Sequence, residues 1–119
     1  MLNEVVHVRQ IPGEPRRRWF LDEFFDLIVW LDESNTFIGF QLIYDKKSKQ
    51  GVLDWRINKG YSHYKMDDGE HTASKPKATP TLTTQKSFDK EFIYQSFLQA
   101  SVSIDKAVAQ FVLEKIKAY

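Results

Sequence analysis

The feature that most constrains the fold is a dense apolar block at residues 24–44, which a short polar turn divides in two. In both halves apolar and aromatic side chains recur on alternate residues, as the side-chain period of two in a β-strand requires. The intervening Asp32-Glu33-Ser34-Asn35 suits a hairpin with a loop of two or four residues. The block therefore predicts two antiparallel strands, at residues 24–31 and 36–44.

A loop of even length fixes which side chains of the two strands share a face. It places odd positions of the first strand beside even positions of the second, whereas a loop of odd length would break this match. The predicted core face is strongly apolar and consists of Phe25, Leu27, Val29, Leu31, Ile38, Phe40, Leu42 and Tyr44. The other face is mixed and consists of Asp26, Ile28, Trp30, Phe37, Gly39, Gln41 and Ile43. Because the core does not explain this second face, we expect the function to lie there.

Weaker patterns extend the sheet before this hairpin. Alternation at residues 4–11 predicts a strand, which the Pro and Gly residues at 12–15 end. Arg16-Arg17-Arg18 follows, and three adjacent arginines could bind phosphate or a carboxylate. We interpret them as a charged strand end that discourages pairing with other chains.

Two further strands are predicted at residues 52–57 and 61–66, joined by a tight turn at residues 58–60. The length of the loop decides where His63 lies. A loop of three residues places His63 on the side of Trp55, whereas a loop of even length places Tyr64 there instead. The sequence leaves both registers open.

Helical periodicity begins at Ser87, a candidate helix cap, after a polar segment at residues 67–86. It weakens at residues 100–103, so the pattern predicts either one bent helix or two, the second over about residues 104–117. The polar segment is either a flap or holds a short strand at residues 80–84. Strands first and helices afterwards predict one α+β domain over residues 1–119, a four- to five-stranded, mainly antiparallel meander with one or two C-terminal helices packed on one sheet face.

Composition excludes several classes of function. The net charge of +1 provides no field to attract nucleic acid or an acidic membrane surface. The absence of cysteine excludes disulfides and thiolate chemistry, and it fits a reducing cytoplasm. No apolar run is long enough to span a membrane, and the first residues do not resemble a signal peptide. We therefore predict a cytoplasmic protein that binds no membrane, with nucleic acid as an unfavoured partner.

Metal and cofactor signals are weak. Asp67-Asp68-Gly69-Glu70-His71 gathers metal-type ligands, but its spacing matches neither a calcium loop nor a helical His-Glu-x-x-His arrangement. A solvated acidic turn is the preferred interpretation. Nucleophile motifs, phosphate loops and dinucleotide fingerprints are missing from the sequence. No metal and no cofactor are predicted.

The mixed face of the sheet is the preferred candidate site for ligand binding or an interface. Its chemically useful residues are Asp26, Trp30, Gln41, Asp54, Arg56 and, in the even-length register, His63. Such groups in an aromatic setting serve ligand binding, or acid–base chemistry if a pKa is shifted. The alternative is an ordinary solvated face with cross-strand charge pairs, but such a face seldom needs Trp30, Ile28 and Ile43.

Two classes of function remain open at this point. The first is a non-catalytic binding or assembly module that uses the mixed face to bind a small molecule, a peptide or, as the preferred partner, a second copy in a homodimer. The second is a small enzyme, a hydrolase or lyase that works through carboxylates and His63 or His71. The lack of any catalytic spacing favours the first.

Several runs of the sequence resemble a group of small bacterial proteins of unknown function. The resemblance lies in Arg17-Arg18-Trp19-Phe20 through residues 26–30, in residues 39–46 and in Asp67-Asp68-Gly69-Glu70. It covers most of the chain and implies a bacterial source. It implies no activity, so no functional residue is carried over from it.

Overall fold

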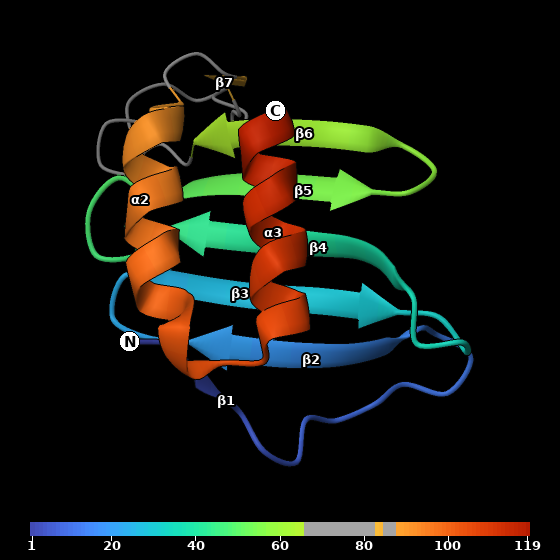
Figure 1. Ribbon diagram of the computed structural model, residues 1–119. Helices are drawn as coiled ribbons and strands as arrows, with labels where there is room; N and C mark the ends of the chain where they lie inside the picture. The colour runs from blue at the N-terminus through green and yellow to red at the C-terminus, as the bar shows by residue number, and fades with distance from the viewer. Residues whose placement is uncertain (66–82, 85–87) are drawn as a thin grey trace, which may run out of the picture.

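The computed structural model describes residues 1–65, 83–84 and 88–119. These residues form one antiparallel sheet of seven strands, whose order in space follows their order in the sequence (Figure 1). The strands are β1 (Asn3–Glu4), β2 (Arg16–Leu21), β3 (Phe25–Leu31), β4 (Phe37–Tyr44), β5 (Gly51–Arg56), β6 (Gly60–Lys65) and β7 (Thr83–Thr84). The predicted antiparallel meander is confirmed, but the sheet has more strands than the four or five predicted.

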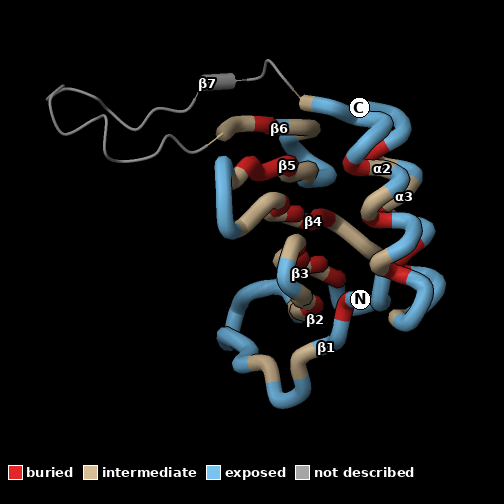
Figure 2. Tube along the Cα trace, turned by 90° about the vertical axis from the view of Figure 1, so that its left-hand side faces the viewer, coloured by how far each residue is buried: buried red, intermediate tan, exposed pale blue. Residues whose placement is uncertain are grey.

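Two helices follow the sheet and cross one of its faces, as Figures 1 and 2 show. They are α2 (Lys90–Ala100) and α3 (Lys106–Ala118), joined by the 3-10 helix η1 (Ser101–Ser103). The predicted break between two helices is confirmed. Asp89 and Asp105 cap α2 and α3, each by accepting a hydrogen bond from a backbone N–H of the first turn. The predicted cap at residue 87 lies outside the described residues.

The N-terminal strands differ most from the prediction. The strand expected at residues 4–11 is wrong, because only Asn3 and Glu4 pair with β2. The chain then leaves the sheet through positive φ angles at His7 and Gly13. The run that begins with Arg16 is itself a strand and pairs along its length with β3. Within the polar segment, β7 supports the predicted short strand. The other residues of 67–86 lie outside the described residues.

The β3–β4 hairpin keeps most of its predicted core face by means of a β-bulge. Leu31 pairs with Phe37, so the loop has an odd number of residues rather than the two or four predicted, and the register shifts beside Trp30. The extra residue in the bulge restores the match along the rest of the hairpin. As a consequence, Phe37 rather than Ile38 points to the helices, where its ring stacks on Phe111 of α3 at 4.7 Å.

The sheet face beneath α2 and α3, which we call the covered face, carries the core. Its largest wholly buried side chains come from both layers and include Phe20, Phe25, Phe40 and Phe97. Burial of each such side chain stabilises the fold by about 1.5–3 kcal/mol. Strand residues alternate between this face and the opposite one, as the burial pattern of β3 shows.

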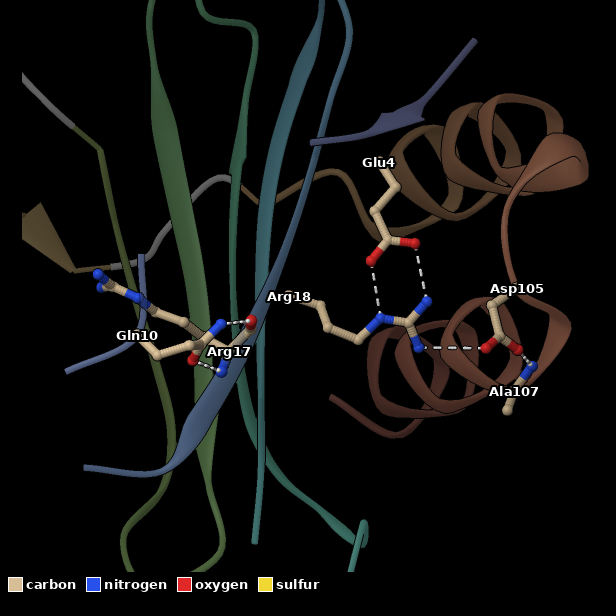
Figure 3. A network of polar contacts seen from close by, with 6 residues as sticks. All are labelled: Glu4, Gln10, Arg17, Arg18, Asp105 and Ala107. Carbon is tan, nitrogen blue, oxygen red and sulfur yellow. Dashed lines mark hydrogen bonds and ion pairs between the residues drawn. The ribbon is translucent and has the colours of Figure 1, made fainter. Parts of the chain in front are cut away.

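Arg18 ties the N-terminal strands to the helical layer (Figure 3). Its guanidinium donates two hydrogen bonds of 2.8 Å to Glu4 and one of 3.1 Å to Asp105, the N-cap of α3. The guanidinium and the backbone N–H of Ala107 hold the pKa of the Asp105 carboxyl below its usual value. The carboxylates that this arginine binds therefore belong to its own chain.

The outer edge of β2 is closed along its length. Val5 donates a backbone hydrogen bond to Trp19 just beyond β1. Further along, the carboxamide of Gln10 accepts a hydrogen bond from the Arg17 backbone N–H and donates one to the Arg17 carbonyl, both at 3.0 Å (Figure 3). The side chain of Gln10 therefore takes the place of a neighbouring strand at this position.

Candidate functional site

The sheet face opposite the helices, which we call the open face, has no helix packed on it among the described residues (Figure 2). The strand registers arrange its side chains in three rows that run across the strands. The first row is Arg17, Trp30, Gly39 and Arg56; the second is Trp19, Ile28, Gln41, Asp54 and Ser62; the third is Leu21, Asp26, Ile43, Val52 and Tyr64. Five of the six predicted site residues lie in these rows.

Trp30 and Arg56 form the best-defined contact of the open face. The guanidinium carbon of Arg56 lies 4.1 Å from the centre of the Trp30 ring, which is a cation–π contact. Gly39 lies between them in the row, and a Cβ atom there would come within 2.8 Å of the Arg56 Cδ atom. The missing side chain at Gly39 is therefore what lets the Arg56 side chain reach across β4 to the ring of Trp30.

The two carboxylates of the open face have different surroundings. Asp26 accepts a hydrogen bond from the indole Nε1–H of Trp19. Asp54 is only 18% exposed, and its carboxylate lies 3.8 Å from Nε of Arg56. Burial raises the pKa of Asp54, although the nearby Arg56 and Lys59 act in the opposite direction. Asp54 is therefore partly desolvated by its neighbours on a face that no helix covers.

His63 is the predicted site residue that does not reach the open face. Arg56 pairs with Gly60, so the β5–β6 loop has three residues, and His63 pairs with Leu53 on the covered face. Of the two registers that the sequence leaves open, the structure has the one with the three-residue loop. Gly60 makes the tight turn possible, because its φ of 82° is one that other residues rarely adopt.

On the covered face His63 is 5% exposed and lies among aromatic rings. Its Nε2 atom is 2.7 Å from the hydroxyl of Tyr44, and the Phe88 ring centre lies 4.8 Å away. Its Nδ1 atom is buried without a hydrogen-bond partner within the described part of the chain. Burial, helped by Lys65, lowers the pKa of His63, and burial raises the pKa of Tyr44 to about 12. Both side chains are therefore neutral at neutral pH.

The structure does not describe the remaining predicted site, the cluster of metal-type ligands. The acidic cluster at residues 67–71, with His71, lies outside the described residues. Residues 1–65 and 88–119 contain no group of three or more His, Asp or Glu side chains placed to hold a metal ion. On the open face the side chains offer charge, amide and aromatic surface, which is the chemistry of binding.

Sequence reasoning missed six members of the open face, namely Arg17, Trp19, Leu21, Val52, Ser62 and Tyr64. Trp19 alternates with Arg17 and Leu21, and this signal was available, but three consecutive arginines obscured the start of β2. Val52 is 4% exposed between its strand neighbours Ile43 and Tyr64. The placement of Tyr64 depends on the length of the β5–β6 loop, which the sequence does not determine.

Comparison of the chain with protein-family models, curated proteins and solved structures found no match. The resemblance to small bacterial proteins therefore stays a prediction. Among the described helices, none is long and apolar enough to cross a membrane.

Proposed function

We propose that the protein is a non-catalytic assembly module that forms a homodimer through the open face of its sheet. The observation that carries this proposal is the set of half-buried apolar side chains, including Ile28, Trp30 and Ile43, on a face that neither α2 nor α3 covers. An exposed apolar surface rimmed by polar groups is typical of an interaction site. The predicted cytoplasmic location and bacterial source belong to the same proposal.

The distribution of charge favours a second copy as the occupant. Arg17 and Arg56 lie in the first row, whereas Asp54 and Asp26 lie in the second and third. A twofold axis parallel to the rows places the first row of one copy, with its arginines, over the third row of the other, with Asp26, while the two second rows, each with Asp54, lie over one another. A twofold axis along the strands would instead oppose the two arginine rows.

The area of the face sets the expected strength of the dimer. Strands β2 to β6 are spaced about 4.8 Å apart, and about six residues of each rise about 3.3 Å apiece, which gives about 480 Å² in projection. Two such faces together bury about 1,000 Å², which is the lower limit for a specific interface. We therefore expect a dimer whose population rises with protein concentration.

The alternative of an enzyme that pairs His63 with a carboxylate receives no support from the geometry. His63 lies on the covered face, whereas Asp26 and Asp54 lie on the open face. A general base must lie within hydrogen-bond reach of the group it serves. The sheet separates His63 from both carboxylates.

The proposal is tested by the mass of the native protein over a wide range of concentration. We expect a dimer at high concentration and its loss in Ile43→Lys, because the substitution places two unpaired charges in the buried interface. Val102→Lys is the matched control, because it adds the same charge at an apolar residue of η1 that is 69% exposed. This control keeps the dimer.

Two results would overturn the proposal. One is a monomer at every concentration, and the other is a dimer that Ile43→Lys leaves unchanged. A small molecule retained in the native mass spectrum and displaced by substitution of Ile43 would assign the face to a ligand instead of a second copy.

A further inference from the structure

A groove of about 390 Å³ lies at one end of the open face, between the chain at residues 14–15 and the β5–β6 turn. Its apolar wall consists of Pro15, Ile38 and Ile57, with the ring of Trp30 beside them. Arg56 and Lys59 contribute positive charge, and Glu14 contributes one negative charge. The groove is therefore an apolar slot whose charged lining is positive by one unit.

Arg56 differs from Arg18 in what its guanidinium binds. The guanidinium of Arg18 donates three hydrogen bonds, two to Glu4 and one to Asp105. The guanidinium of Arg56 makes no hydrogen bond to any described residue, and its Nε is 3.8 Å from Asp54, beyond the range of a hydrogen bond. The cation–π contact with Trp30 nevertheless restrains the position of the guanidinium. Arg56 is thus a donor group at the wall of a groove whose N–H bonds have no hydrogen-bond acceptor among the described residues, and whose nearest described carboxylate is Asp54.

We propose that this groove binds a small organic carboxylate with a planar, apolar body. The carboxylate accepts two parallel hydrogen bonds from the Arg56 fork, which matches its geometry, and Lys59 adds a second positive charge. The planar body packs on the apolar wall, beside Trp30 and Arg56. Glu14 disfavours ligands of higher negative charge, because a second charge would lie near its carboxylate.

The groove lies at the margin of the open face, whereas Ile28 and Ile43 lie in its second and third rows. Trp30 and Arg56 of the first row also belong to the face that the proposed dimer covers, so the ligand is titrated at concentrations where the protein is monomeric. The monomeric variant Ile43→Lys separates the two proposals, because it removes the dimer and leaves every lining residue of the groove in place.

The test is a titration of the protein with benzoate, followed by chemical shifts of backbone amides and of the Arg56 Nε–H. We expect saturable shifts confined to the groove, with a Kd on the order of 1 mM for so small a probe. The same shifts are expected in Ile43→Lys. Benzamide, which is neutral and of the same shape, and inorganic phosphate, which lacks the apolar body, are expected to produce no saturable shifts there.

Variants then assign the binding to Arg56. We expect Arg56→Gln to weaken benzoate binding at least about tenfold, because a charge-assisted bidentate contact is lost. Arg56→Lys keeps the charge without the fork and is expected to lie between the two. Lys106→Gln is the matched control, because it removes the same charge from an exposed residue of α3, and it binds as the wild type does.

Three outcomes would overturn the inference. The first is the absence of any saturable shift, and the second is wild-type affinity in Arg56→Gln. The third is an equal loss of affinity in Lys106→Gln and Arg56→Gln, which would indicate attraction to the whole protein instead of a site. A wild-type protein that stays monomeric at every concentration and still binds benzoate would contradict only the proposed function.

Discussion

Phe40 and Leu42 of β4 are wholly buried on the covered face, whereas Gln41 between them is half-buried on the open face. The same alternation runs through β3. On the covered face two helices exclude water from the side chains, so volume and shape decide which residues fit. On the open face the side chains shield only one another, so charge and exposed aromatic surface persist there. One set of strands therefore carries a packed core on one side and a mixed polar and aromatic surface on the other.

The largest expected effect comes from the covered face. Phe40→Ala removes a side chain with no exposed surface and leaves a cavity beneath α3, so we expect a loss of about 3–5 kcal/mol in the free energy of unfolding. Urea denaturation measures it. A loss below about 1 kcal/mol would contradict the view that packing on this face dominates stability.

Gly51→Ala is expected to have the next largest effect. A Cβ atom at Gly51 would lie 2.2 Å from Cζ of Tyr44, so the Tyr44 ring must shift. Overpacking of this kind costs about 1–3 kcal/mol, measured by the same denaturation. Gly60→Ala serves as a comparison at a glycine with open space around it, where only the positive φ opposes the substitution.

The buried histidine makes the stability of the covered face depend on pH. Its folded pKa is lowered by burial below the value of 6.5 that applies when unfolded, so the unfolded chain binds the proton first as pH falls. Stability is therefore unaffected by His63 well above pH 6.5. As pH falls through 6.5 and below, the free energy of unfolding decreases by up to about 1.4 kcal/mol per pH unit.

This pH dependence is measured by denaturation of the wild type and of His63→Gln between neutral and mildly acidic pH. The wild type is expected to lose more stability on acidification than the variant, because a glutamine does not titrate. Parallel pH profiles for the two proteins would show that His63 is not the group responsible.

The smallest expected effect on stability comes from the open face. Trp30→Ala removes the contact with Arg56, and we expect a loss of about 1 kcal/mol, since exposed cation–π contacts contribute about 0.5–1 kcal/mol. The native mass and the response to benzoate are expected to change more than the stability does. If mass, benzoate response and stability all stayed as in the wild type, the open face would have no role in binding.

The contrast between the faces also explains what the sequence could predict. Alternation of apolar residues in β3 and β4 was sufficient to predict the core face, because a period of two is a local property. The bulge beside Trp30 was not predictable, because it depends on how the five-residue loop fits between the paired strands. That bulge exchanges the positions of Phe37 and Ile38, and it places Ile38 in the groove.

The candidate site was predictable to the same degree. Asp26, Trp30 and Gln41 share a face because they lie within two long strands of a single hairpin. The sheet face on which His63 lies depends on the length of the β5–β6 loop, and the sequence alone does not determine that length. The contact between Arg56 and Trp30 reaches across β4, and it required a register between three strands as well as a glycine in the middle one.

The carboxamide of Gln10, bonded to the backbone of Arg17, limits how copies of this chain can join. A sheet with a bare edge at β2 could accept a strand from a neighbour, which could accept another in turn, and so lengthen into a fibre. With that edge occupied by β1 and Gln10, β2 offers no such template, which fits the association through open faces that we propose. Stacked faces hide each other completely, so growth by that route ends at two.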